Sequence, residues 1–230
     1  MNAFAQSMLD QLQNPDERVG FTLSIVGGPR MSCSCGDFMI LRSEEKTLIR
    51  SCLGTTKKEG PRVLDIGGGI GRHSAFARET SPDAIVTIVE INQRLREYCQ
   101  SVIPGAVGYI QFGDVPDDAR FDVAFLMGNG LGIFGSEDAT RQGLQRLSRL
   151  IVDGGCVLIE AGNFNRGDFS AVEHTIEYGG VVDGPFTWGY ATKQWLQREL
   201  HAAGFEIDSF TPSSVGGPFF ICHATKRPEA

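Results

Sequence analysis

The segment from Val63 to Ser74 constrains the fold of this chain more than any other part of the sequence. It reads VLDIGGGIGRHS: an apolar run that contains an acid, three consecutive glycines, a spacer and a fourth glycine. The apolar residues predict a buried strand, and the glycines predict a turn whose backbone closely approaches another group, because glycine has no side chain in the way. A helix beginning near Arg72 would complete a strand, turn and helix unit of the kind that binds nucleotide-like cofactors.

The spacing of the glycines separates the cofactor classes. A dinucleotide fingerprint needs Gly-x-Gly-x-x-Gly, but Arg72 or Ser74 occupies the third glycine position, depending on where the count begins. A phosphate-binding loop needs Gly-Lys-Ser or Gly-Lys-Thr after its spacer, and neither stands there. The sequence has instead an acid and three glycines at alternate positions, then an acid at the end of the next apolar run: Asp65, Gly67, Gly69, Gly71 and Glu90.

Strands and helices alternate from Arg62 onward. We expect strands at 62–67, 84–90, 107–112, 121–127 and 155–160, and helices at 72–80, 92–102 and 136–151. Strands joined by helices imply right-handed crossovers and a mainly parallel sheet with both faces covered. A helix at 192–203 and two strands at 205–210 and 219–225, joined by a short loop, predict a terminal antiparallel hairpin. The predicted fold class is therefore α/β, a doubly wound, seven-stranded, mainly parallel sheet with an antiparallel last strand.

Two regions do not follow this alternation. Residues 1–60 have helical periodicity at 2–12 and again from Ser43 to Leu53, with an irregular stretch between them. We therefore expect an N-terminal helical cap at 1–60 and a main domain at 61–230. Within the main domain, the insertion 162–192 is too long for a bare connection and is rich in aromatic residues. The cap and this insertion are predicted to enclose a substrate.

The motifs around Asp65 and Glu90, together with the terminal hairpin, resemble those of the class I S-adenosylmethionine-dependent methyltransferases. The resemblance covers roughly residues 61–227 and implies a Rossmann-like methyltransferase fold that binds S-adenosyl-L-methionine. It assigns to cofactor binding the residues at the ends of the first four strands: Asp65, Gly67, Gly69, Gly71, Glu90, Ile91, Gly113, Asp114, Val115, Met127, Gly128 and Asn129. In this assignment Glu90 accepts hydrogen bonds from the ribose hydroxyls and Asp114 lies near the adenine amino group.

The segment from Phe121 to Gly135, FDVAFLMGNGLGIFG, resembles the fourth-strand region of methyltransferases that act on small molecules. It lacks the Asn/Asp-Pro-Pro-aromatic signature of enzymes that methylate planar amino groups, and no Pro-Cys nucleophile of the cytosine-modifying type is present. The resemblance therefore implies a small-molecule methyl acceptor.

Methyl transfer from a sulfonium is an in-line displacement, in which alignment matters most and a base is optional. If the acceptor must lose a proton, His174 and Tyr190 in the insertion are the predicted catalytic residues, with His73, Asp168 and Glu173 as further candidates. Ordinary structural roles stay open for each of these residues. His174 could be an exposed loop histidine, the glycine loop a tight turn and Glu90 a helix cap.

The length, charge and cysteine content argue against several classes of function. A length of 230 residues suits one large domain, and a formal net charge of -7 gives no basic surface for nucleic acid. No signal peptide or membrane span is visible, so we expect a cytoplasmic protein without a membrane partner. The six cysteines are expected to be reduced, and the pair Cys33 and Cys35 lacks a second pair for zinc, so no metal site is predicted. A homo-oligomer is compatible with the sequence.

Three functions remain to be separated. The favoured one is methyl transfer from S-adenosylmethionine to a small molecule. The second is a non-catalytic partner subunit that binds the cofactor on the same fold and exposes an apolar patch for its partner. The third is a nicotinamide-dependent oxidoreductase, which the missing third glycine of the dinucleotide fingerprint disfavours.

Overall fold

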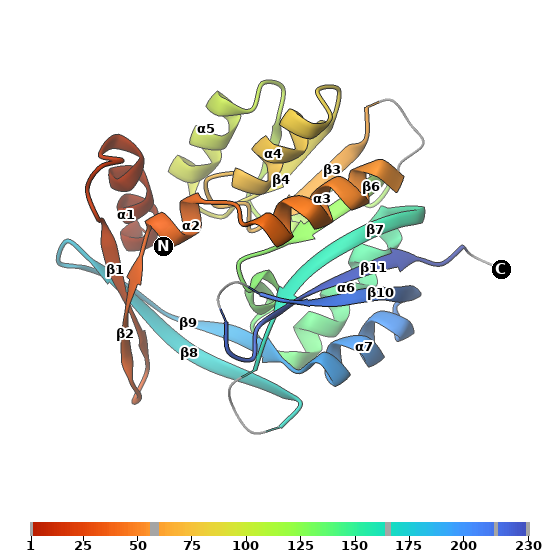
Figure 1. Cartoon of the computed structure of the whole chain (residues 1–230). Coiled ribbons are helices and arrows are strands. Elements are labelled where there is room, and N and C mark those ends of the chain that lie inside the picture. Colours follow the sequence, from red (N-terminus) through yellow and green to blue (C-terminus); the bar gives the residue numbers. More distant parts are fainter. Residues whose placement is uncertain (1, 56–59, 164–166, 214–215, 229–230) are drawn as a thin grey trace.

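A seven-stranded sheet forms the centre of the computed structural model, which describes residues 2–55, 60–163, 167–213 and 216–228 (Figure 1). The strand order is β10-β11-β7-β6-β3-β4-β5. The bounds are β3 (Arg62–Ile66), β4 (Ile85–Val89), β5 (Val107–Tyr109), β6 (Phe121–Leu126), β7 (Ile151–Ala161), β10 (Phe205–Pro212) and β11 (Phe220–Lys226). Strands β3 to β7 run parallel, whereas β11 is antiparallel to β7 and to β10. The predicted fold class is confirmed.

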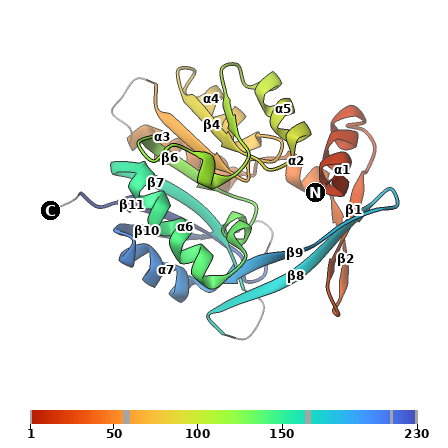
Figure 2. The same cartoon turned by 180° about the vertical axis from the view of Figure 1, so that it is seen from behind.

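Helices cover both faces of this sheet, as the views from the two sides show (Figures 1 and 2). One face carries α3 (Ser43–Thr55), α4 (Arg72–Thr80) and α5 (Gln93–Val102), and the other carries α6 (Glu137–Leu150) and α7 (Lys193–Ala202). Among the described residues, none of the helices combines the length and the apolar character that a membrane crossing needs.

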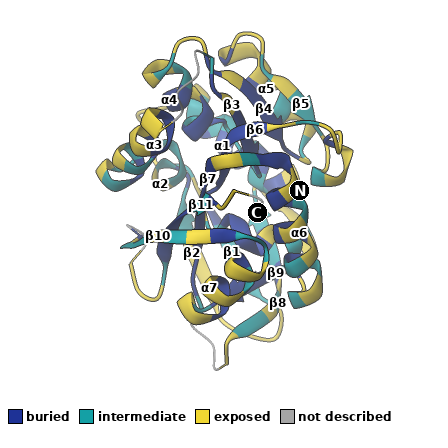
Figure 3. Ribbon diagram, turned by 90° about the vertical axis from the view of Figure 1, so that its right-hand side faces the viewer, coloured by how far each residue is buried: buried dark blue, intermediate teal, exposed yellow. Residues whose placement is uncertain are grey.

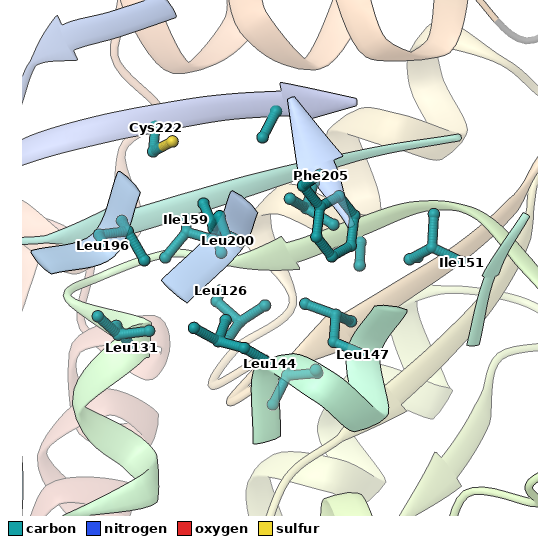
Figure 4. Packing of buried hydrophobic residues seen from close by; sticks show 14 of the residues in the cluster. Leu126, Leu131, Leu144, Leu147, Ile151, Ile159, Leu196, Leu200, Phe205 and Cys222 are labelled. Carbon is teal, nitrogen blue, oxygen red and sulfur yellow. The ribbon is translucent and has the colours of Figure 1, made fainter. Parts of the chain in front are cut away.

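Each face of the sheet has its own apolar core. Under α6 and α7, side chains from both helices interlock with those of the strands, as Leu126, Leu144, Leu200 and Phe205 do in Figure 4. These four residues are fully buried, and the strands at the centre of the molecule are buried in the same way (Figure 3). Burying one such side chain stabilises the fold by about 1.5–3 kcal/mol, so the two cores hold the strand ends in fixed positions.

The N-terminal region and the insertion join in a second sheet, and here the sequence-based expectation was incomplete. This four-stranded antiparallel sheet has the order β2-β1-β8-β9. Its strands are β1 (Gly20–Ile25), β2 (Arg30–Ser34), β8 (Phe169–Tyr178) and β9 (Val181–Ala191). The stretch expected to be irregular forms a hairpin, so the cap is not purely helical. The helices α1 (Asn2–Gln13) and α3 agree with the predicted ones, and α2 (Gly36–Met39) is an additional short helix.

The second sheet is attached to the main sheet beside the glycine loop. Its apolar face and α1 form a cluster that includes Met8, Phe21 and Ile176. Leu95 of α5 belongs to the same cluster, and Ile70 of the glycine loop packs against it. The cap is therefore held against the end of the main sheet where the loops follow the carboxyl ends of β3 and β4 (Figure 1).

Two short 3-10 helices replace regular structure after β5 and β6. The strand predicted at 107–112 ends at Tyr109, and η1 (Phe112–Asp114) follows it. After β6, η2 (Gly130–Phe134) runs alongside β9 of the second sheet. Both turns lie at the carboxyl ends of parallel strands, where doubly wound folds bind their ligands.

Candidate active site

The glycine loop after β3 has a backbone that only glycine adopts readily. Gly67, Gly69 and Gly71 have φ angles of 73°, 56° and 74°, in the left-handed region. A Cβ on Gly71 would lie 3.0 Å from Cys99 Sγ, so glycine is needed there for close packing, whereas nothing lies within 4 Å of the position of a Cβ on Gly69. The loop is thus packed against α5 on one side and open above Gly69.

Glu90 follows β4 and points its carboxylate at this loop. Its Oε2 accepts a hydrogen bond from the N–H of Gly69 at 2.9 Å, and its Oε1 accepts one from the N–H of Asn92 at 2.8 Å. The side chain is buried, and this burial raises the pKa of Glu90. A carboxylate offers about four acceptor positions, so each oxygen keeps one for a ligand. The neighbouring Ile91 is 54% exposed and offers an apolar surface beside that carboxylate.

Asp65 lies beneath the loop and is almost completely buried. Its Oδ2 accepts a hydrogen bond from Ser74 Oγ at 2.7 Å, which ties the end of β3 to the first turn of α4. Burial raises the pKa of Asp65. These contacts connect Asp65 to protein groups on the α4 side of the loop.

The turn after β5 holds the third group of predicted residues. Asp114 is exposed, and its Oδ2 accepts a hydrogen bond from the N–H of Gln111 at 2.9 Å within the same turn. Val115 is buried, and Gly113 leaves open space where a Cβ would stand. Arg146 of α6 donates to the carbonyl of Val115 and so fixes the turn from the other face of the sheet. The sequence analysis did not single out Arg146.

The turn after β6 is held by a residue that the sequence analysis also missed. The Oε2 of Glu160, at the end of β7, accepts hydrogen bonds from the N–H groups of Gly128 at 2.6 Å and Asn129 at 3.2 Å. Its Oε1 accepts a hydrogen bond from Ser213 Oγ. Glu160 is buried. The sequence could have indicated this residue, because it lies at the carboxyl end of a predicted parallel strand, where doubly wound folds place their functional groups. Met127, which precedes this turn, is buried as well.

Asn129 has a strained backbone at the centre of this turn. Its φ of 56° is positive, which is uncommon for a residue other than glycine. Its carbonyl oxygen accepts a hydrogen bond from Trp188 Nε1 of β9 at 3.1 Å, so the second sheet is fastened to the turn. Its buried Oδ1 has no hydrogen-bond partner among the described residues. The positive φ and the unsatisfied buried acceptor make Asn129 a candidate for contact with a ligand.

His174 and Tyr190, the predicted catalytic residues, lie side by side in the second sheet. His174 Nε2 and Tyr190 Oη are 2.9 Å apart and hydrogen-bonded. Both residues are buried, so His174 is not an exposed loop histidine. Burial lowers the pKa of His174 and raises the pKa of Tyr190 to about 12, so both are neutral at pH 7. Phe186 also lies beside the His174 ring, with ring centroids 6.0 Å apart.

His73, the further base candidate, has a different environment. Its Nε2 lies 3.1 Å from Glu45 Oε1, and the same oxygen accepts a hydrogen bond from Arg72 Nη2 at 3.1 Å. The Nη1 of Arg72 also donates to the backbone carbonyls of Asp37 and Ile40. This cluster fastens the N-terminal segment to the start of α4, so its residues hold the cap in place beside the glycine loop.

Comparisons with known proteins identify the fold. The sequence matches no protein-family profile and no curated protein sequence. An S-adenosylmethionine-dependent methyltransferase from Bacteroides fragilis, solved with S-adenosyl-L-homocysteine, is 17% identical with a TM-score of 0.75 over 98% of this chain and 95% of that chain. The 1,6-didemethyltoxoflavin-N1-methyltransferase from Burkholderia thailandensis is 16% identical with a TM-score of 0.63, over 99% of this chain and 88% of that chain.

A third similar structure is a TehB-like S-adenosylmethionine-dependent methyltransferase from Corynebacterium glutamicum. It is 17% identical with a TM-score of 0.62, over 99% of this chain and all of that chain. The chain therefore has the fold of the class I S-adenosylmethionine-dependent methyltransferases. Because the matches extend over nearly the whole chain, the likeness extends beyond the seven-stranded sheet.

Proposed function

We propose that this protein transfers a methyl group from S-adenosyl-L-methionine to a small organic molecule. The observation that carries the proposal is the Glu90 carboxylate at the end of β4, which reaches the glycine loop after β3 and keeps an acceptor position on each oxygen. A pair of ribose hydroxyls is the group that such a carboxylate binds best. The fold that the chain shares with S-adenosylmethionine-dependent methyltransferases supports the same cofactor.

We assign the site residues to the parts of that cofactor as follows. Glu90 would hold the ribose, and the exposed Ile91 and the open turn at Gly113 and Asp114 would border the adenine. The open backbone at Gly69 leaves room for the nucleoside next to the loop. Asp65, Gly67, Gly71 and Val115 would shape this pocket, and Met127 and Gly128 would border its methionine end.

The unsatisfied Oδ1 of Asn129 supports a binding role for the turn after β6. An ammonium or amide donor of a bound ligand would satisfy this oxygen, and Glu160 holds the turn in the conformation that presents it. When bound, S-adenosylmethionine supplies an electrophilic methyl group on a sulfonium. The protein's part is then to align the acceptor and to exclude water.

The Tyr190 and His174 pair would serve as the proton acceptor. Tyr190 Oη would take a proton from an acceptor O–H or N–H and pass its own hydroxyl proton to the neutral imidazole at His174 Nε2, so that the released proton ends on His174. Neither group carries a charge at pH 7, so the pair suits an acceptor that loses its proton as the methyl group arrives.

The chemistry of the second sheet favours a flat, partly apolar acceptor. Phe186, Trp188 and Tyr190 alternate along β9 and therefore point to one face of that sheet. The similar structure from Burkholderia thailandensis was solved with 1,6-didemethyltoxoflavin bound, which is in line with such an acceptor. The six free thiols fit a reducing compartment, so we place the protein in the cytoplasm.

The function is tested by binding and by product analysis. Calorimetry with S-adenosylhomocysteine should show binding that Glu90→Ala removes, and the purified protein with labelled S-adenosylmethionine and host extract should label a small metabolite. Binding without any labelled product would support a non-catalytic cofactor-binding subunit. Binding of a reduced nicotinamide dinucleotide in place of S-adenosylhomocysteine would overturn the proposal.

A further inference from the structure

Two thiols and an imidazole converge in the core between α3 and the main sheet, away from the cofactor site. Cys52 comes from α3, Cys156 from β7 and His223 from β11, and one ligand atom from each lies within 4.8 Å of the others. Their exposed fractions are 0%, 1% and 9%. Cys156 is level with Val123 and Val63 in the sheet register, toward the ends of the strands opposite to the glycine loop.

The surroundings of the three groups are apolar. Val63, Phe125 and Leu158 belong to the cluster of buried side chains that contains both cysteines. His223 Nε2 is buried and has no hydrogen-bond partner among the described residues. Two thiols and an imidazole that converge in an apolar core are costly unless they are paired, and one bound metal ion would pair all three groups at once.

The ligand set and its spacing suit a thiophilic divalent ion. Neighbouring ligand atoms in a tetrahedral zinc site stand about 3.5–4 Å apart, because Zn–S bonds are about 2.3 Å and Zn–N bonds about 2.0–2.1 Å long. Thiolates and imidazoles are common zinc ligands in proteins. Two thiolates and one imidazole would fill three positions of a tetrahedral site and leave the fourth for a non-protein ligand. Two thiolates also cancel the charge of Zn²⁺, so the assembly is neutral in its apolar surroundings.

Asp208 supplies the group that usually accompanies a metal-bound histidine. Its Oδ2 lies 3.6 Å from His223 Nε2 and accepts a hydrogen bond from Thr225 Oγ1 at 2.7 Å. A carboxylate at the second ring nitrogen orients a metal-bound imidazole and makes it a better ligand. With Nε2 directed to Asp208, Nδ1 is the ring nitrogen left for the metal.

We propose that Cys52, Cys156 and His223 bind one Zn²⁺ ion, with Asp208 as the positioning carboxylate. Binding forms two Zn–S bonds and one Zn–N bond, and the two thiol protons are released to solvent. The ion links α3 to β7 and β11, so it would stabilise the packing of the N-terminal region on the sheet. Sequence spacing did not predict this site, because its ligands come from elements far apart in the chain.

The test uses the full-length protein, metal depleted with a chelator and then titrated with Co²⁺ and Zn²⁺. Co²⁺ should produce thiolate-to-metal charge-transfer absorption that saturates at about one ion per chain, and Zn²⁺ should abolish it. Cys156→Ser should remove the absorption. Cys222→Ser is the matched control, because Cys222 of β11 is, like Cys156 of β7, a buried strand cysteine, but it packs on the opposite face of the sheet. This control should keep the absorption.

Asp208→Asn provides a second measurement that does not disturb the core. Competition with a chromophoric chelator should show Zn²⁺ affinity reduced about 10- to 100-fold in this variant. The proposal is overturned if the unmodified protein gives no charge-transfer absorption, if Cys156→Ser keeps it, or if Asp208→Asn binds Zn²⁺ as tightly as the unmodified protein does. The readouts are spectroscopic and independent of methyl transfer, so failure here leaves the proposed function untouched.

Discussion

Replacing Glu90 by glutamine should weaken binding of S-adenosylhomocysteine by about 10- to 150-fold. The carboxylate already accepts one N–H at each oxygen, from Gly69 and from Asn92, and we assign the remaining acceptor positions to the two ribose hydroxyls. Glutamine keeps one acceptor oxygen, so at least one hydroxyl loses its charge-assisted hydrogen bond. Such a bond contributes about 1.5–3 kcal/mol, which corresponds to the stated change in Kd.

Isothermal titration calorimetry of the two proteins measures this change directly. The matched control is Glu97→Gln, which removes the same charge from an exposed position on the neighbouring helix α5, where Glu97 contacts only Gln93 among the hydrogen bonds described. This control should bind with unchanged affinity. Thermal melting of Glu90→Gln establishes that the variant is folded. A Kd within twofold of the unmodified value, or an equal loss in the control, would refute the reasoning.

The same carboxylate should make cofactor binding depend on pH. Burial raises the pKa of Glu90, the charge of Asp65 adds to this, and the N–H groups of Asn92 and Gly69 oppose it. The folded chain thus disfavours the ionised form, and the stability linked to this group is present below the unfolded pKa and lost as pH rises through the folded pKa. The ribose needs the ionised form, so affinity should rise with pH through that range. Calorimetry across pH should show this rise, and Glu90→Gln should lack it.

Three further variants test other parts of the site. Gly132→Ala would place a Cβ 1.9 Å from Trp188 Nε1, so the melting temperature should fall by an amount equivalent to about 1–3 kcal/mol, whereas Gly113→Ala, in open space, should melt unchanged. Glu160→Gln should lower the free energy of unfolding in a urea titration by about 1–3 kcal/mol, because two backbone N–H groups share the Oε2 of this buried carboxylate, and an unchanged midpoint would contradict this. Tyr190→Phe should reduce kcat by about 10²–10⁴-fold in a methylation assay without changing the Kd of S-adenosylhomocysteine, and an unchanged kcat would exclude the proton-accepting role.

The main sheet was predictable because its signals are local. The helix expected at 72–80 is observed as α4 at those bounds, since Gly71 with its positive φ precedes it and Ser81 with Pro82 follows it. The glycine loop and Glu90 lie at the ends of adjacent parallel strands, so their approach to each other follows from the order of the motifs. The assignment of neighbouring strand ends to one site therefore needed no long-range information.

The second sheet was not predicted because its pairing is long-range. β1 pairs with β8, and the two strands are separated by most of the main domain. One local signal was available: Gly179 and Gly180 both have positive φ and join β8 to β9, and Gly-Gly between two strand-like runs is typical of a tight hairpin. Glu160 and Arg146 were missed for a related reason, since each acts on a turn that only tertiary packing brings to it.

Long-range contacts also connect the N-terminal region and the second sheet to the turns that follow β3 and β6. Arg72 stands immediately after the glycine loop, yet its guanidinium holds the backbone at Asp37 and Ile40 and the buried carboxylate of Glu45. Trp188 makes the corresponding connection from β9 to the turn at Asn129. The cap and strand β9 of the second sheet are thus each fastened to a turn that we assign to the cofactor. The second sheet carries Tyr190 and His174, so we expect a shift of those turns on cofactor binding to move this pair, and under the proposed function cofactor binding would then influence the position of the proton acceptor.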